Sequence, residues 1–349
     1  MTTKVKPMRN SNARTPRLLS LSVLALLAGC SMAPIYERPP APVAAQWPAF
    51  SADNTAATTA AADMAWQDFV GDARLRELVT LALDNNRDLR VALAAIEQAR
   101  AQYQIRRADQ LPTINAAVAG NRQPSSDGES ISSAYTAGLA MASWELDFFG
   151  RVASLKDAAL AQFLATQEAR NAVQTSLIAS VVSTWLSLQT NNELLALTQR
   201  TLATRQDSLR LNRMRFEQGV TSALDLRQAE SLTAAAQATL AQQRRLRALD
   251  VNALTQLVGQ PLPETLLAAP AIPAAQSLHD VPVGMPSDLL ERRPDIRQAE
   301  QQLIAANANI GAARAAFFPR IALTASAGTA SGALSGLFQS GAWGWTLAP

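Results

Sequence analysis

The chain offers few residues that could carry out chemistry: its 349 residues include a single cysteine, Cys30, and a single histidine, His279. His279 lies in a proline-rich stretch, where a lone histidine is more often a surface residue than a catalyst. Glu145 and Asp147 form a pair of neighbouring carboxylates, but they precede a predicted helix, whose N-terminus favours acidic side chains. The sequence also lacks a metal-ligand cluster, a Gly-x-Ser-x-Gly motif and a phosphate-binding loop. We therefore expect a protein that is not an enzyme and needs no cofactor.

Residues 1–29 have the features of an export signal. They contain five basic residues and no acidic residue, and residues 18–29 form a mostly apolar stretch of 12. This stretch is too short to cross a bilayer, which takes about 20 helical residues. It ends in Leu27-Ala28-Gly29 directly before Cys30, a pattern that resembles a bacterial lipoprotein signal. The alternative is an ordinary export signal in which the cysteine is incidental.

A lipoprotein signal is cut before Cys30, and the thiol then carries diacylglycerol. Two or three acyl chains on one residue anchor a protein stably, whereas a single chain does not. Ser31 follows in place of an aspartate, which favours the outer membrane by resemblance to the bacterial sorting rule. Loss of the five basic residues changes the formal net charge from +3 to −2 (+3 − 5), so the charge gives no reason to expect a nucleic acid partner. An acylated Cys30 also leaves no thiol for a disulfide.

No later segment reads as a transmembrane helix. Apolar residues make up 48% of the chain, but they are interleaved with Gln, Arg and Glu. A chain of this kind that crosses a membrane must do so as strands of a closed barrel. Apolar residues alternate with small or polar ones, as in strands, over 114–118, 135–141, 321–325 and 343–347. These segments suit membrane hairpins, and a soluble hairpin packed on a core is the alternative.

The sequence repeats itself at an offset of 207 positions. Arg107-Ala108-x-x-x-Pro112-x-Ile114 recurs as Arg314-Ala315-x-x-x-Pro319-x-Ile321. Residues 87–114 match 294–321 at 9 of 28 positions without a gap. A period this long is not that of a solenoid. It indicates a duplicated large unit, in which the repeated proline ends a helix and a strand follows.

Between Gly150 and Gly219 lie 68 residues with neither glycine nor proline. One helix of that length would extend about 100 Å at 1.5 Å per residue. A single apolar column recurs every seven residues, which indicates a left-handed coiled-coil contact. Its members are Val181, Leu188, Leu195, Leu202, Leu209 and Phe216. The remaining faces are largely polar, so this helix needs further partners and also meets water.

A short turn separates this helix from a second stretch without glycine or proline, residues 220–258. Gly219 suits a left-handed cap at the end of the first helix. Ser222 suits an N-cap, with Asp225 at the third position of the second helix. On capping grounds alone, the segment is a helical-hairpin turn and no more.

Several motifs in order resemble the TolC-like outer membrane efflux proteins, in the lipoprotein branch called NodT-like or OprM-like. The resemblance extends over residues 30–349. Its motifs are Trp66-x-x-Phe69-x-x-Asp72, Asn85-Asn86-x-Asp88-Leu89-Arg90, Ser143 to Arg151, Gly219-Val220-x-Ser222-x-Leu224-Asp225, and Pro286 to Arg297. Each is moderate evidence by itself, and together they are specific.

The resemblance implies a mainly α fold with membrane β-strands. It combines a TolC-like long α-helical coiled-coil barrel with outer-membrane β-barrel strands, and it is internally duplicated. Family members are homotrimers, so the long helices pack on neighbouring protomers on one side and face water on the other. The second copy in this chain stops short of a full repeat. We therefore expect a chain that is C-terminally truncated relative to its family.

The resemblance also implies a function and partners. The expected protein is a passive exit duct in the outer membrane of a Gram-negative bacterium, extending into the periplasm. It belongs to a tripartite efflux system with a periplasmic adaptor and an inner-membrane pump of the RND type. Gly219, Val220, Ser222, Leu224 and Asp225 would form the periplasmic tip that docks the adaptor. The alternatives are a structural lipoprotein that spans the periplasm and the duct of a type I secretion system.

The expected division of the chain follows from these assignments. It comprises a signal peptide (1–29), a lipid-anchored Pro/Ala-rich tether (30–65), a helical segment of the first copy (66–110), a membrane hairpin (111–149), a long periplasmic helical hairpin (150–260), a crossover linker (261–285), a helix of the second copy (286–316) and a second, truncated membrane hairpin (317–349).

Overall fold

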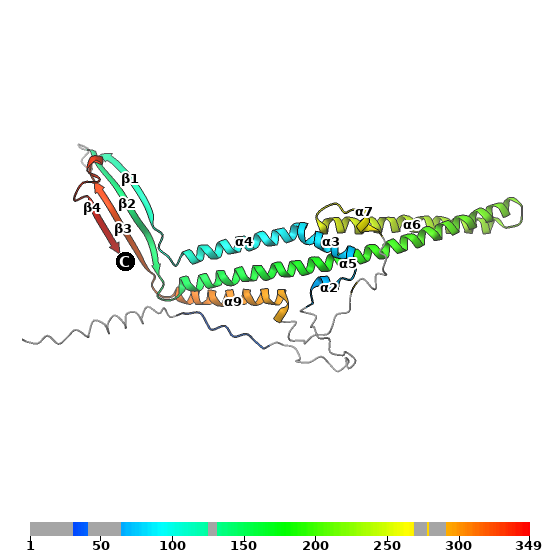
Figure 1. Ribbon diagram of the computed structural model, residues 1–349, viewed down its shortest axis with the longest axis horizontal. Helices are drawn as coiled ribbons and strands as arrows, with labels where there is room; N and C mark the ends of the chain where they lie inside the picture. The colour runs from blue at the N-terminus through cyan, green and yellow to red at the C-terminus, as the bar shows by residue number, and fades with distance from the viewer. Residues whose placement is uncertain (1–30, 41–63, 125–130, 269–277, 279–290) are drawn as a thin grey trace, which may run out of the picture. The chain divides into compact units, whose positions relative to one another are not determined.

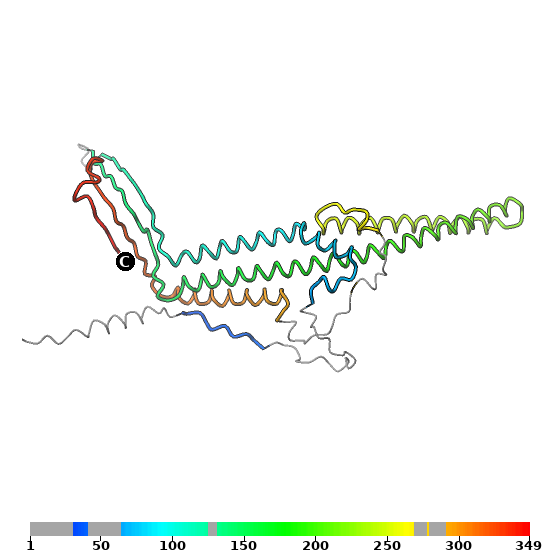
Figure 2. The backbone as a smooth tube through the Cα atoms, viewed as in Figure 1, coloured from blue at the N-terminus to red at the C-terminus, as the bar shows by residue number. Residues whose placement is uncertain are grey.

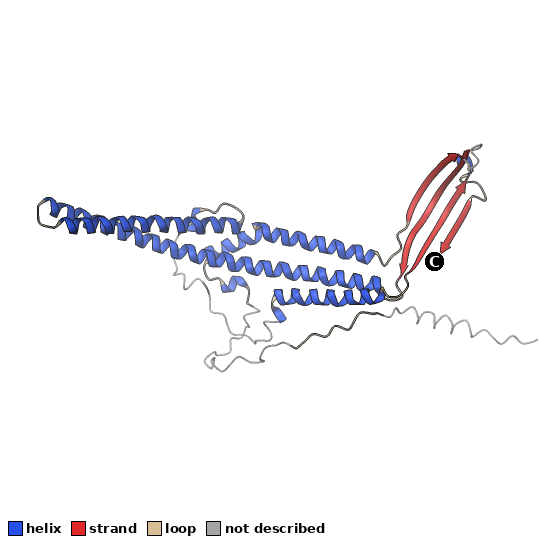
Figure 3. Cartoon of the chain, turned by 180° about the vertical axis from the view of Figure 1, so that it is seen from behind, coloured by secondary structure: helices blue, strands red, loops and turns tan. Residues whose placement is uncertain are grey.

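A computed structural model describes residues 31–40, 64–124, 131–268, 278 and 291–349 of the chain. The described elements are mainly helices, and the strands gather in one sheet (Figure 3). The chain divides into two compact units. The first contains 98–165, 300–349 and the N-terminal residues up to Arg38, and the second contains 39–97 and 166–299. Three helices contribute to both units: α4 (Arg87–Ala108), α5 (Arg151–Glu217) and α9 (Pro294–Ala315).

The sheet of the first unit is antiparallel throughout, in the order β1-β2-β3-β4 (Figure 1). Its strands are β1 (Asn115–Pro124), β2 (Ile131–Leu146), β3 (Ile321–Ser331) and β4 (Trp343–Ala348). The central pair, β2 and β3, joins the two copies of the sequence repeat, with Leu146 opposite Ile321. The register of this pair shifts between Met141 and Trp144. The duplicated halves therefore share one hydrogen-bonded sheet.

No residue of these four strands is buried, although all of the strands are described. Val118 is 81% exposed and Trp345 is 71% exposed. A soluble hairpin packed on a core would bury one face of its sheet, and the described sheet of one chain buries neither face. Among the described helices, none meets the length and hydropathy that a membrane span requires.

The second unit contains the main hydrophobic core. Helix α3 (Ala73–Asn85) buries one face, including Leu75 and Leu78, because its apolar residues recur at helical spacing. This face packs with Trp185 of α5, with Leu254 of α6 (Ala223–Val258) and with Leu266 of α7 (Glu264–Leu267). The unit also contains the short helix α2 (Trp66–Phe69).

Helices α5 and α6 lie side by side as an antiparallel hairpin (Figures 1 and 2). Near the core, Asp250 of α6 accepts hydrogen bonds from Ser187 Oγ at 3.1 Å and from Asn191 Nδ2 at 2.6 Å on α5. The seven-residue column of α5 is fully buried at Val181 and Leu188, whereas Phe216 near the turn is 40% exposed. Burial of the column thus falls with distance from the core, because α3 and α7 no longer cover α5 there.

The long-range repeat corresponds to one structural feature that occurs twice. Helix α4 ends at Ala108 and α9 ends at Ala315, an offset of 207 (315 − 108). Each end is followed by the repeated proline and then by a strand, β1 or β3. The repeated residues therefore mark the place where a helix leads into the sheet.

The segment 31–38, which we call the strap, is extended and docked on α9 (Figure 2). Asn307 Nδ2 donates to the carbonyl oxygen of Pro34 at 2.7 Å. Glu300 accepts from the hydroxyl of Tyr36 at 3.2 Å and from Nε of Arg38 at 2.6 Å. Burial is the main cause of a raised pKa of Tyr36, followed by the negative charge of Glu300 and the hydrogen bond to it.

The two partners match in length. The five steps of extended chain from Ala33 to Arg38 cover about 16 Å at roughly 3.3 Å per step. The eleven steps along α9 from Glu300 to Gly311 cover about the same distance at roughly 1.5 Å per step. The weakly structured tether expected from the sequence is therefore extended but docked over this part. Cys30 and His279 lie outside the described residues, as do 41–63 and most of the expected crossover.

We predict that Gly311→Leu releases the strap. A Cβ added at Gly311 would lie 2.7 Å from the Cβ of Ala33, so a larger side chain cannot fit beneath the strap. Overpacking of this kind costs about 1–3 kcal/mol. Glutamyl endopeptidase should therefore cleave after Glu37 about tenfold faster in the variant than in the wild type. Ala313→Leu, at an exposed position of the same helix, is the control, and equal cleavage rates in all three proteins would contradict the docking.

Candidate functional site

The candidate site is the turn between α5 and α6, which lies at the end of the helical hairpin (Figure 2). Gly219 adopts φ +73°, the left-handed conformation that residues with a Cβ rarely adopt. The amide of Gly219 donates to the carbonyl of Phe216 at 2.9 Å, and that of Val220 donates to Arg215 at 2.8 Å. These two bonds form a Schellman motif, which satisfies the last carbonyls of α5.

Ser222 and Asp225 close the start of α6 with a capping box. The hydroxyl of Ser222 accepts from the amide of Asp225 at 3.2 Å, and Oδ2 of Asp225 accepts from the amide of Ser222 at 3.2 Å. The same Oδ2 also accepts from the hydroxyls of Ser222 at 2.6 Å and Thr221 at 2.9 Å. The carboxylate predicted as a docking residue is thus also an element of local structure.

These hydrogen bonds favour the ionised form of Asp225. The side-chain bond from Ser222 is the largest cause, followed by that from Thr221, and together they lower the pKa of Asp225. Because the folded-state pKa is lowered, the stabilisation is present above the ordinary pKa and is lost as the pH falls through the lowered value. The turn therefore carries a negative charge at neutral pH.

The turn directs two apolar side chains outward. Val220 is 75% exposed and Leu224 is 67% exposed. A Cβ built at Gly219 would meet nothing within 4 Å, so this glycine leaves bare surface beside them. The turn therefore presents two exposed apolar side chains and one carboxylate. These groups are candidate contacts for a partner.

Two open hollows flank the hairpin near this turn, and sequence reasoning did not identify either. One has a volume of about 330 Å³ and the other about 250 Å³. The polar residues beside the seven-residue column, such as Arg205 and Arg213, were the available signal. The first hollow is lined by Gln206, Leu209, Arg210, Arg213, Met214, Glu217, Thr233 and Gln237, and the second by Arg205, Ser208, Asn212, Asp225, Gln228, Ala229 and Leu232.

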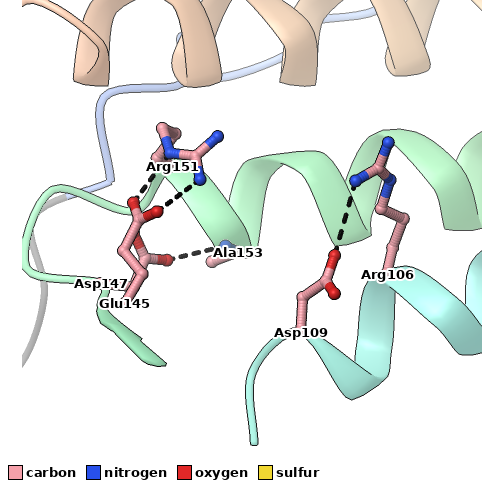
Figure 4. Close-up of polar contacts among 6 residues, drawn as sticks. All are labelled: Arg106, Asp109, Glu145, Asp147, Arg151 and Ala153. Atoms are coloured by element: carbon pink, nitrogen blue, oxygen red, sulfur yellow. Dashed lines mark hydrogen bonds and ion pairs between the residues drawn. The ribbon is translucent and has the colours of Figure 1, made fainter. Parts of the chain in front are cut away.

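Glu145 and Asp147 have structural partners (Figure 4). Asp147 accepts from the amide of Ala153 at 2.7 Å, at the start of α5. Glu145 accepts from Nε of Arg151 at 2.8 Å, and a second bond joins the same two side chains. The hydrogen bond that Arg151 donates to Glu145 is the main cause of a raised pKa of Arg151. Over the described residues, no group of three or more His, Cys, Asp or Glu side chains is arranged to hold a metal ion.

Comparisons with known proteins agree on one family. Residues 78–260 and 285–348 match the family described as outer membrane efflux protein. The chain is 47% identical over 345 residues to the probable efflux pump outer membrane protein TtgC of Pseudomonas putida, covering 96% of this chain and 71% of that protein. It is 46% identical over 338 residues to the outer membrane protein OprJ of Pseudomonas aeruginosa, covering 95% and 70%.

Solved structures give the same result. A membrane protein from Pseudomonas aeruginosa matches with a TM-score of 0.83 at 45% identity, covering 92% of this chain and 73% of that one. The open state of the Neisseria gonorrhoeae MtrE outer membrane channel matches with a TM-score of 0.81 at 42% identity, covering 92% and 71%. The chain thus covers about seven tenths of the length of each of these proteins.

We predict that Ser222→Ala loosens the first turn of α6 without unfolding the hairpin. Loss of an N-cap hydroxyl costs about 1 kcal/mol, which corresponds to about a fivefold loss of hydrogen-exchange protection at the amide of Asp225. Ser231→Ala, at an exposed position within α6, is the matched control and should leave protection unchanged. Unchanged exchange in Ser222→Ala would show that the capping box does not hold the turn.

Proposed function

The chain belongs to the outer membrane efflux protein family, and we propose on this premise that it is the outer-membrane channel component of a tripartite efflux system. It would be a passive exit duct of the RND-type systems, with energy supplied by an inner-membrane pump. The TolC-like fold class predicted from the sequence is confirmed by the likeness to solved outer membrane channels. The single observation that carries the proposal is this family match over most of the chain.

The proposed docking surface for the adaptor is the hairpin turn. Val220 and Leu224 are exposed there with no partner inside the described part of the chain, and Asp225 adds a fixed negative charge. Gly219 leaves room for close approach of a second helical hairpin. An apolar contact with one charge at its edge would supply both affinity and register.

The proposed assembly is a homotrimer in contact with a periplasmic adaptor and an inner-membrane pump. Support comes from the part-exposed apolar column of α5 near the turn, which needs partners beyond α6. Support also comes from the sheet, whose apolar side chains stay exposed in one chain. Strands with such exposure fit a closed membrane structure formed by several copies.

Cys30 is the proposed site of lipid attachment. The sequence Leu27-Ala28-Gly29-Cys30 supports cleavage before the cysteine. The docked strap adds support because its first residues, directly after Cys30, lie against the part of α9 that leads into β3. Acyl chains on Cys30 would then enter the membrane near the strands.

We predict that Asp225→Lys weakens adaptor binding about fivefold or more, because it replaces the charge that the adaptor would face and corresponds to about 1 kcal/mol. The measurement is site-specific photocrosslinking from position 224 to the adaptor in cells. Ser222→Ala removes the cap but keeps the charge, so it separates docking from turn stability. A crosslinking yield of Asp225→Lys equal to that of the wild type would contradict the assignment of the turn as the docking surface.

We predict that the full-length protein forms ion channels in planar bilayers. A water-filled duct gives discrete conductance steps, whereas a structural lipoprotein that spans the periplasm gives none. Gly219→Trp should alter the resting conductance if the turn closes the channel, and Leu303→Gln, at an exposed position of α9, should not. Absence of conductance with and without an adaptor would contradict the channel function.

We predict that Cys30→Ser abolishes metabolic labelling with palmitate, because the thiol is the attachment atom. Ser31→Ala, next to the cysteine, is the control and should keep the label. Persistent labelling of Cys30→Ser would refute the lipoprotein assignment.

A further inference from the structure

The repeated arginines have a common place in the fold that the channel function does not explain. Arg107 lies in the last turn of α4 and Arg314 in the last turn of α9. Both side chains are exposed, and each precedes by a few residues the strand that its helix feeds. A cation is favoured at any helix C-terminus, which explains why each helix ends with a basic residue. This preference does not explain why each arginine is also followed by an exposed apolar side chain and a strand.

The acidic side chains near these helix ends have partners other than the two repeated arginines. Asp109 pairs with Arg106 at 3.5 Å, and Glu145 pairs with Arg151 (Figure 4). Asp147 is bonded to the amide of Ala153 at 2.7 Å. Within the residues that the structure describes, neither repeated arginine has an ion pair. Both repeated guanidinium groups are therefore free to contact an anion outside the described part of the chain.

Exposed apolar side chains follow each arginine at similar spacing. Leu111, four residues after Arg107, is 69% exposed, and Phe317, three residues after Arg314, is 91% exposed. The neighbouring Phe318 instead stacks on Phe149, with ring centroids 4.5 Å apart. A cation followed by an outward apolar side chain and then by an apolar strand is the order required to cross from lipid headgroups into acyl chains.

The strap gives an independent marker of the same level. Ala33 lies against Gly311, which is one helical turn before Arg314. Cys30 is three residues from Ala33, and three residues of chain reach at most about 10 Å. Acyl chains on Cys30 would therefore enter the bilayer close to the end of α9. This argument uses backbone contacts alone and does not depend on the charge balance.

We propose that Arg107 and Arg314 form two equivalent sites for the phosphate of anionic phospholipids in the periplasmic leaflet of the outer membrane. The planar guanidinium groups match phosphate oxygens in a paired geometry. Leu111 and Phe317 contact the adjoining acyl chains. The duplicated motif thus provides one lipid contact for each helix that leads into the sheet. The inference rests on the proposed outer-membrane function.

The test is titration of the detergent-solubilised, full-length chain with phosphatidylglycerol, followed by native mass spectrometry. Arg107→Gln should lower the apparent affinity about fivefold, and Arg107→Gln/Arg314→Gln should lower it further. Arg106→Gln is the matched control, since Arg106 is paired with Asp109 and should leave lipid binding unchanged. Phosphatidylcholine should bind more weakly than phosphatidylglycerol to the wild type and equally to the double variant.

Three outcomes would overturn the inference. The first is equal phosphatidylglycerol affinity in the wild type and the double variant. The second is displacement of the lipid by millimolar inorganic phosphate, which would indicate a site for free anions. The third is a loss of helix stability in the double variant, by circular dichroism, without a loss of lipid affinity. Conductance of the same preparations separates the two proposals, since channels that conduct but lack this lipid preference contradict the inference alone.

Discussion

The structure depends on one uninterrupted helix. Helix α5 has 67 residues, and its apolar residues form a stripe too narrow to bury in a core of its own. Around Trp185, the helices α3, α6 and α7 cover that stripe. Toward the turn only α6 remains beside it, and Phe216 is partly exposed. In the proposed assembly of several copies, neighbouring copies would cover the part of the stripe that α6 alone leaves exposed.

Both proposed binding surfaces consist of side chains that have no role in the local hydrogen bonds and ion pairs. At the hairpin turn, the Schellman motif and the capping box satisfy the backbone groups, and Val220 and Leu224 remain outside. At the helix ends that lead into the sheet, every acidic side chain named above is occupied, and Arg107 and Arg314 remain. Polar groups that already have hydrogen-bond partners gain little from a new contact. The remaining apolar side chains and charges are therefore the groups that a partner would bind.

Local physics explains why much of the site could be predicted. Absence of glycine and proline over 151–218 predicted the long helix, which the structure contains. Gly219 and Ser222 predicted the caps that the structure forms. The flanking hollows were not predicted, because they depend on the pairing of α5 with α6. The role of Glu145 was also missed, since its partner Arg151 lies across a turn whose geometry the sequence does not specify.

The sequence by itself determined the elements, the duplication and the family, because periodicity, caps and motif order are properties of neighbouring residues. The tertiary structure alone decided that residues 31–38 dock on α9, through contacts such as Asn307 with Pro34, 273 positions apart. It also decided that β2 joins the two copies of the repeat in one sheet. Contacts at such separation depend on which surfaces meet after folding, and no local pattern encodes them.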